Sequence, residues 1–151
     1  MRARSVVGLA PDESLAVNVE RILAVRVAEL RSFMPAARDP ERVRELHDMR
    51  IAAKRLRYLL ELVGREVLGD RATRAIALLK ELQDVLGDVH DCDVLAPRLA
   101  QFEGEGVDVL AEHLRLRRAE RFARFRVLWP EVEQAATSCS HGPGGERIAS
   151  Q

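Results

Sequence analysis

Apolar residues recur along this chain at intervals of three and four, which is the spacing of one buried face of an α-helix. No stretch alternates apolar and polar residues in the way a β-strand does. The pattern therefore predicts four to five amphipathic helices and no strands. Because such helices bury their apolar faces against one another, we expect an all-α fold, an antiparallel helical bundle with short connecting loops.

Start and stop signals divide the chain into helical segments. The predicted helices cover residues 11–33, 39–64, about 70–86, 89–102 and 107 to about 136, of which the fourth is either a short helix or a continuation of the third. The first two segments open with proline beside acidic residues, a combination typical of a helix N-terminus. The chain thus begins with two well-marked helices.

A few residues are expected to interrupt the helical pattern. Pro35 should stop the first helix, and Gly87 should form a kink or a C-cap. Gly104 and Gly106 should form a loop, after which Pro130 should bend or interrupt the last helix. These positions set the lengths of the predicted helices.

Length and composition limit the number of domains. The chain has 151 residues, of which 47% are hydrophobic, enough for one domain with a core. We place this domain at residues 10–136. Residues 137–151 contain Ser, Gly and Pro with little to bury, so we expect a disordered C-terminal tail.

Charge and cysteine content narrow the class of protein. The 24 basic residues balance the 24 acidic ones, so any anion-binding site must be a local patch. Cys92 and Cys139 form no CxxC pattern, and no signal-peptide run opens the chain, so we expect no disulfide, no zinc site and a cytoplasmic location. Charges interrupt every apolar segment, so no membrane association is expected.

One face of the second predicted helix carries four potential cations, namely His47, Arg50, Lys54 and Arg57. They fall within an arc of about 80° and extend over roughly 15 Å, which matches a row of phosphates better than one small anion. A solvated helix face, compensated by acids such as Glu61, is the competing interpretation. No acidic residue occurs between Met49 and Leu60, so the charge is uncompensated along the helix, which favours a binding role.

The last predicted helix is a second basic segment. Arg117 and Arg121 align beside its apolar side chains, whereas Arg118 falls within the apolar group. A buried arginine needs a partner, and Asp84 or Asp91 could supply one. An ordinary arginine-rich surface explains this helix as well as a binding role does.

Two His-Asp pairs, His47-Asp48 and His90-Asp91, raise the alternative of a metal-dependent phosphohydrolase. Adjacent residues on a helix point about 100° apart, so one such pair does not readily hold one metal ion. The chain also lacks the sequence motifs of NTPases, serine hydrolases and zinc proteases. We therefore expect neither a metal, nor a cofactor, nor catalysis.

Two strings, LHDMRIAAKRLRYLLELV and LLKELQDVLGDVHDCDVL, cover roughly residues 45 to 95 and together resemble the CHAD family, the histidine-containing α-helical domain. The resemblance implies a helical bundle with a basic groove or pore that binds inorganic polyphosphate without hydrolysing it. It assigns phosphate contacts to His47, Arg50, Lys54 and Arg57 and to Lys80, and more loosely to Arg117 and Arg121. Both lysines of the chain lie in these strings.

The chain departs from the family in size, because CHAD domains usually carry two motif-bearing bundles and this sequence holds the motif once. The resemblance therefore implies a half-pore, completed by a homodimer or left as an open groove. It also implies a location at polyphosphate granules as one option. Nucleic acid is a disfavoured partner, because only Tyr58 lies near the basic face to stack on a base.

Overall fold

The computed structural model describes residues 2–140, and these are helical throughout apart from the first residues and the connections. The elements, in chain order, are α1 (Leu15–Arg31), α2 (Met34–Ala37), α3 (Val43–Leu59), the π-helix η1 (Leu60–Gly64), α4 (Arg65–Leu68), α5 (Asp70–Leu99) and α6 (Glu105–Cys139). No strand occurs within residues 2–140. The all-α prediction is confirmed.

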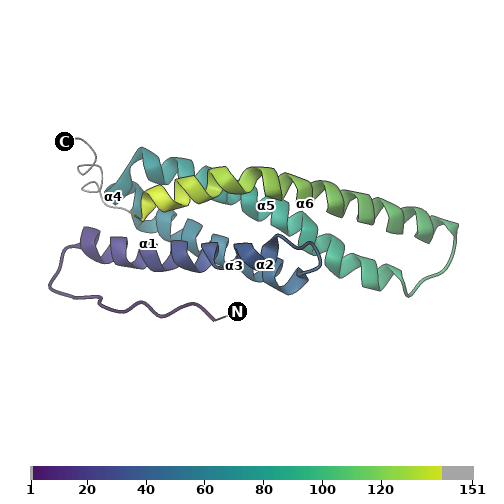
Figure 1. Ribbon diagram of the computed structural model, residues 1–151, viewed down its shortest axis with the longest axis horizontal. Coiled ribbons are helices and arrows are strands. Elements are labelled where there is room, and N and C mark those ends of the chain that lie inside the picture. The colour runs from purple at the N-terminus through teal and green to yellow at the C-terminus, as the bar shows by residue number, and fades with distance from the viewer. Residues whose placement is uncertain (1, 141–151) are drawn as a thin grey trace.

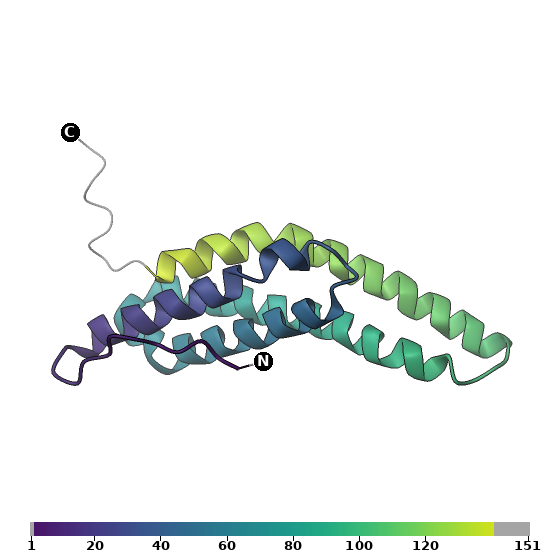
Figure 2. The same ribbon diagram turned by 60° about the horizontal axis from the view of Figure 1, so that its bottom comes forward.

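The four long helices α1, α3, α5 and α6 pack lengthwise into one bundle (Figure 1). Helix α5 packs against both α3 and α6, and α1 packs against α3 and α6. The hairpin formed by α5 and α6 extends well beyond the ends of the other helices (Figure 2). The four long helices therefore contact one another in the order α1, α3, α5, α6 and back to α1, so that α3 and α6 are the neighbours of α5.

The first two predicted helix starts are each a few residues too early. Helix α1 begins after Ser14, whose hydroxyl accepts a hydrogen bond from the Val17 amide at 3.4 Å. Asp39 does not cap α3, because its carboxylate accepts from the Glu41 amide at 2.9 Å and closes a turn ahead of the helix, which starts at Val43. Local side-chain bonds thus move both starts toward the C-terminus.

Pro35 does not simply stop a helix, because it lies at the start of α2, after α1 has ended at Arg31. The second predicted helix ends close to Gly64, where the π-helix passes into the short α4. A Cβ at Gly64 would lie 2.9 Å from Cδ2 of Leu60, so only glycine fits this turn without a shift of its neighbours.

Neither Gly87 nor Pro130 interrupts its helix. Helix α5 continues through Gly87 to Leu99, so residues 89–99 extend the third predicted helix. Helix α6 begins at Glu105, which places Gly106 within the helix, and continues through Pro130. Burial of neighbouring side chains such as Trp129 offsets the local cost of the proline.

The predicted disordered tail begins too early. Residues Thr137 to Cys139 belong to α6, and the Cys139 side chain is fully buried with its Sγ 3.6 Å from the Arg71 carbonyl oxygen. The domain therefore extends past residue 136. Residues 141–151 lie outside the described part of the chain.

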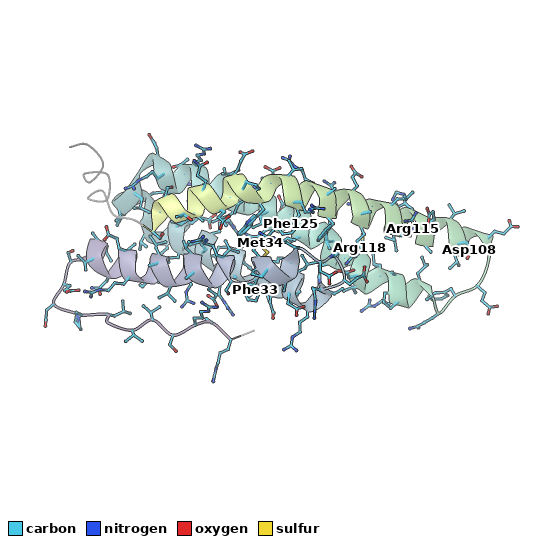
Figure 3. The ribbon with its side chains drawn as sticks, in the orientation of Figure 1. Phe33, Met34, Asp108, Arg115, Arg118 and Phe125 are labelled. Carbon is cyan, nitrogen blue, oxygen red and sulfur yellow. The ribbon has the colours of Figure 1, made fainter. Side chains whose placement is uncertain are left out.

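The core consists of apolar side chains from all four long helices, among them Leu23, Leu56 and Leu79. It also includes Phe125 of α6, which Figure 3 labels. One carboxylate, Glu29 of α1, is buried with them at 2% exposure. It is paired with arginines from α1 and α3 and accepts a hydrogen bond from the N-terminal segment. No pattern in the sequence predicts this buried charge.

Candidate anion-binding surface

The predicted basic face of α3 lies along helix α5. The His47 ring lies against that of His90, with centroids 4.5 Å apart. Nearly three turns of α3 further on, Arg57 Nε lies 3.4 Å from the Gln83 side-chain oxygen. We call this row of basic residues, His47, Arg50, Lys54 and Arg57 of α3 together with Lys80 of α5, the basic stripe.

Gly87 lies between those two contacts. A Cβ placed on Gly87 would lie 3.6 Å from Nε of Arg50, so the guanidinium of Arg50 rests on the bare backbone of α5. Gln83, Gly87 and His90 follow the i, i+4, i+7 spacing of one helix face. This spacing could have revealed the contact surface in advance. The prediction of a kink or a C-cap at Gly87 does not use this spacing.

Three cations of the basic stripe lack an acidic partner. Within residues 2–140, no carboxylate forms an ion pair with Arg50, Lys54 or Lys80. Lys54 is exposed, and its ammonium lies 5.5 Å from the centre of the Tyr58 ring. Lys80 is exposed one turn of α5 beyond Gln83. These three charges are therefore available to an external anion.

Arg57, by contrast, is partly neutralised. Its Nη1 forms an ion pair with Glu61 one turn along α3 and η1, and its guanidinium also lies 4.5 Å from the Tyr58 ring centre. An anion that binds Arg57 must compete with Glu61. Glu61, which the sequence analysis named as a compensating acid, therefore neutralises one of the four basic residues on α3.

The structure pairs Arg117 and Arg121 of α6 with an acid on α5. Arg117 Nη2 and Arg121 Nε lie 3.2 and 2.8 Å from the two oxygens of Asp88. A cavity of about 310 Å³ beside this cluster is lined by Glu81, Asp84, Val85, Asp88, Glu120, Arg121 and Arg124. Its four carboxylates disfavour an anion, so these two arginines do not extend the basic stripe in the free protein.

Arg118 finds its partner elsewhere than expected. Its Nε lies 2.5 Å from Asp93, and its Nη2 donates to the Pro40 carbonyl oxygen at 2.6 Å, so neither Asp84 nor Asp91 is the partner. The side chain lies near the point where the hairpin leaves the bundle (Figure 3). Arg118 thereby ties α6 to α5 and to the turn that precedes α3.

Burial and neighbouring charges lower the pKa of the His47 imidazole. Loss of solvent, followed by the nearby His90 and then Arg50, lowers the pKa of His47 from its usual 6.5, while Asp48 opposes the shift. The Nδ1 atoms of His47 and His90 are buried and have no hydrogen-bond partner within residues 2–140. A proton on His47 is therefore disfavoured in the free protein.

The lowered pKa predicts a loss of stability in acid. Below about pH 6.5 the unfolded chain takes up a proton at residue 47 before the folded chain does, so the free energy of unfolding should fall as the pH decreases. Urea unfolding of the wild type and of His47→Gln, compared from about pH 8 to about pH 5, measures this. The variant should lose part of the pH dependence, whereas His113→Gln, an exposed control, should keep all of it. Identical pH profiles for all three proteins would contradict the prediction.

The described residues offer no metal site. Within residues 2–140, no group of three or more His, Cys, Asp and Glu side chains is placed to hold a metal ion. His47 and His90 instead contact each other across the α3–α5 interface. None of the helices in this part of the chain has the length and apolar character needed to span a membrane.

Comparison with known proteins places this arrangement in a family. The family model described as the CHAD domain matches residues 3–100. The chain belongs to the CHAD family. The match covers every helix from α1 to α5, and so includes all residues of the basic stripe, whereas α6 lies outside it. No curated protein and no solved structure matches this CHAD chain.

Proposed function

We propose that this CHAD domain binds inorganic polyphosphate along the basic stripe and does not hydrolyse it. The observation that carries the proposal is that Arg50 and Lys54 of α3 and Lys80 of the adjoining helix α5 have no acidic partner in residues 2–140. Like charges held together in this way repel one another, and a polyanion relieves that repulsion. Membership of the CHAD family supports the same ligand.

The shape of the stripe favours a chain of phosphates over a single ion. From His47 to Arg57 the helix rises by about 15 Å, so successive cations can contact successive phosphates. Arginine grips phosphate oxygens in pairs, and lysine adds a mobile point charge. Arg117 and Arg121 would first have to leave Asp88, so we assign them a secondary role.

A salt titration with polyphosphates of several lengths tests the proposal. Each phosphate contact releases a bound counterion, so the logarithm of affinity should fall linearly with the logarithm of salt concentration. If the four arginine and lysine side chains of the stripe take part, the slope should approach about −2.8, taking about 0.7 per contact as for single strands. Affinity should also rise with chain length until the stripe is filled. An affinity that does not change with salt concentration or with polyphosphate chain length would refute the proposal.

The absence of hydrolysis is tested with the same protein. Pure protein incubated with polyphosphate and Mg²⁺ or Mn²⁺ should release no phosphate above the background. Phosphate release that is abolished by His90→Ala would instead support a phosphohydrolase that uses the His-Asp pairs.

We also propose that a second copy of the chain completes the polyphosphate site, as the resemblance to two-bundle CHAD domains implies.

A further inference from the structure

The outer part of the α5–α6 hairpin has no helix packed against it. From Asp93 to Arg121, no side chain is buried. Figures 1 and 2 show this part projecting past α1 and α3, and Figure 3 places Asp108 and Arg115 far out along it. Two helices alone cannot bury the apolar faces of both, so one face of the hairpin is left uncovered.

This uncovered face is apolar and grooved. A groove of about 230 Å³ is lined by Leu95, Arg98, Leu99, Phe102, Leu110 and Leu114. Phe102 is 66% exposed, and Leu95 and Leu110 are each nearly half exposed. Single exposed leucines are ordinary, but large apolar side chains gathered on one groove indicate a contact surface.

Two opposite charges lie on the face of α5 that carries this groove, and one of them, Arg98, lines it. Asp91 and Arg98 lie two helical turns apart, and Leu95 lies between them on the same face. Neither charge has an ion-pair partner within residues 2–140. An acid four residues before a leucine and a base three residues after it form a nearly self-complementary pattern when two such helices pack antiparallel.

We propose that a second copy of this chain docks on the groove, with the two α5 helices antiparallel across a two-fold axis close to Leu95. This symmetry places Arg98 of each copy beside the partner's Asp91, so both ion pairs form at once. The leucines and Phe102 of the two hairpins then cover one another in a four-helix arrangement. An unrelated protein would need to carry this charge spacing independently, whereas a second copy supplies it by symmetry.

The docking also has a consequence for the basic stripe, and this part rests on the proposed function. A two-fold axis perpendicular to the plane of the paired α5 helices leaves both α3 helices on the same side of the pair. Each stripe then begins with His47 near the axis and runs outward. Two half-sites are thereby aligned for one polyphosphate chain.

The docking is tested without polyphosphate, by light scattering and sedimentation of the full chain over a wide range of concentration. Wild type should dimerise, and Leu95→Glu should be monomeric with unchanged helicity, because Leu95 is already half exposed in the free chain. Leu116→Glu, on an exposed residue outside the groove, is the matched control and should still dimerise. A wild type that stays monomeric, or a dimer that survives Leu95→Glu, would overturn the proposal.

A charge-reversal experiment tests the symmetry itself. Arg98→Glu and Asp91→Arg should each raise the dimer dissociation constant by about tenfold or more, because each places like charges together twice. A mixture of the two variants should regain dimers, because both pairs between unlike copies are then attractive. Failure of the mixture to associate would exclude this interface.

If a variant no longer dimerises but each monomer still binds polyphosphate, the interface is disproved as a requirement and the proposed function stands. If the protein dimerises as described but does not bind polyphosphate, only the proposed function is disproved.

Discussion

Replacing Arg50 and Lys54 together by alanine is expected to weaken polyphosphate binding by about a hundredfold at low salt. A hydrogen bond to a charged group contributes about 1.5–3 kcal/mol, and each 1.4 kcal/mol corresponds to about tenfold in affinity. Both cations lack an acidic partner in residues 2–140, so no internal ion pair is lost with them. Folding stability should therefore change little, and the salt slope should become shallower by about 1.4.

The control for this variant removes the same charge from elsewhere. Arg115 and Arg126 are exposed on α6 and lie outside the basic stripe, so their joint replacement by alanine should leave affinity nearly unchanged. Isothermal titration calorimetry or fluorescence polarisation, each over several salt concentrations, provides the measurement. An equal loss in both double variants would show that binding follows net charge alone and would contradict the site.

Replacing Glu29 by alanine is expected to lower the free energy of unfolding by about 3 kcal/mol, because it removes a buried carboxylate from two partly buried guanidinium groups. Glu29 Oε2 lies 2.7 Å from Arg26 Nη1, and Oε1 accepts from the Arg4 amide at 3.2 Å. Arg55 Nη1 of α3 lies 3.4 Å from Oε1. One carboxylate thus joins the N-terminal segment, α1 and α3.

An exposed ion pair provides the comparison for Glu29. Glu13 pairs with Arg21 in solvent, where such pairs contribute less than about 1 kcal/mol, so Glu13→Ala should have a small effect. Urea unfolding at neutral pH measures both variants. If Glu29→Ala costs no more than Glu13→Ala, the buried carboxylate does not hold these segments together. Neither substitution touches the basic stripe, so polyphosphate affinity of the folded protein should stay unchanged.

The helix count and the basic face of α3 were predictable because both depend on residues close in sequence. The 100° step between neighbours places His47, Arg50, Lys54 and Arg57 on one side whatever the rest of the chain does. The apolar periodicity likewise predicts a bundle before any contact is known. Helix ends were less predictable, because the side chains of Asp39 and Ser14 can each accept a hydrogen bond from more than one nearby backbone amide, and the amide that donates decides where the helix starts.

The continuity of α5 decides between the two alternatives that local signals left open after Gly87. Glycine within a helix costs about 1 kcal/mol, and burial of neighbours such as Leu86 and Val89 outweighs it. Gly87 therefore remains helical and serves as the surface on which Arg50 rests. Pro130 is accommodated in α6 for the same reason.

By itself, the sequence determined an all-helical chain, its CHAD family and a row of cations on one helix, because these follow from local spacing and a short motif. Only the tertiary structure decided which cations remain available, because pairing depends on the side chains that packing brings opposite. It placed Asp88 against Arg117 and Arg121, and Asp93 against Arg118. It left Arg50, Lys54 and Lys80 without acidic partners in residues 2–140, since the antiparallel contact of α3 with α5 sets His90, Gly87 and Gln83 opposite the stripe.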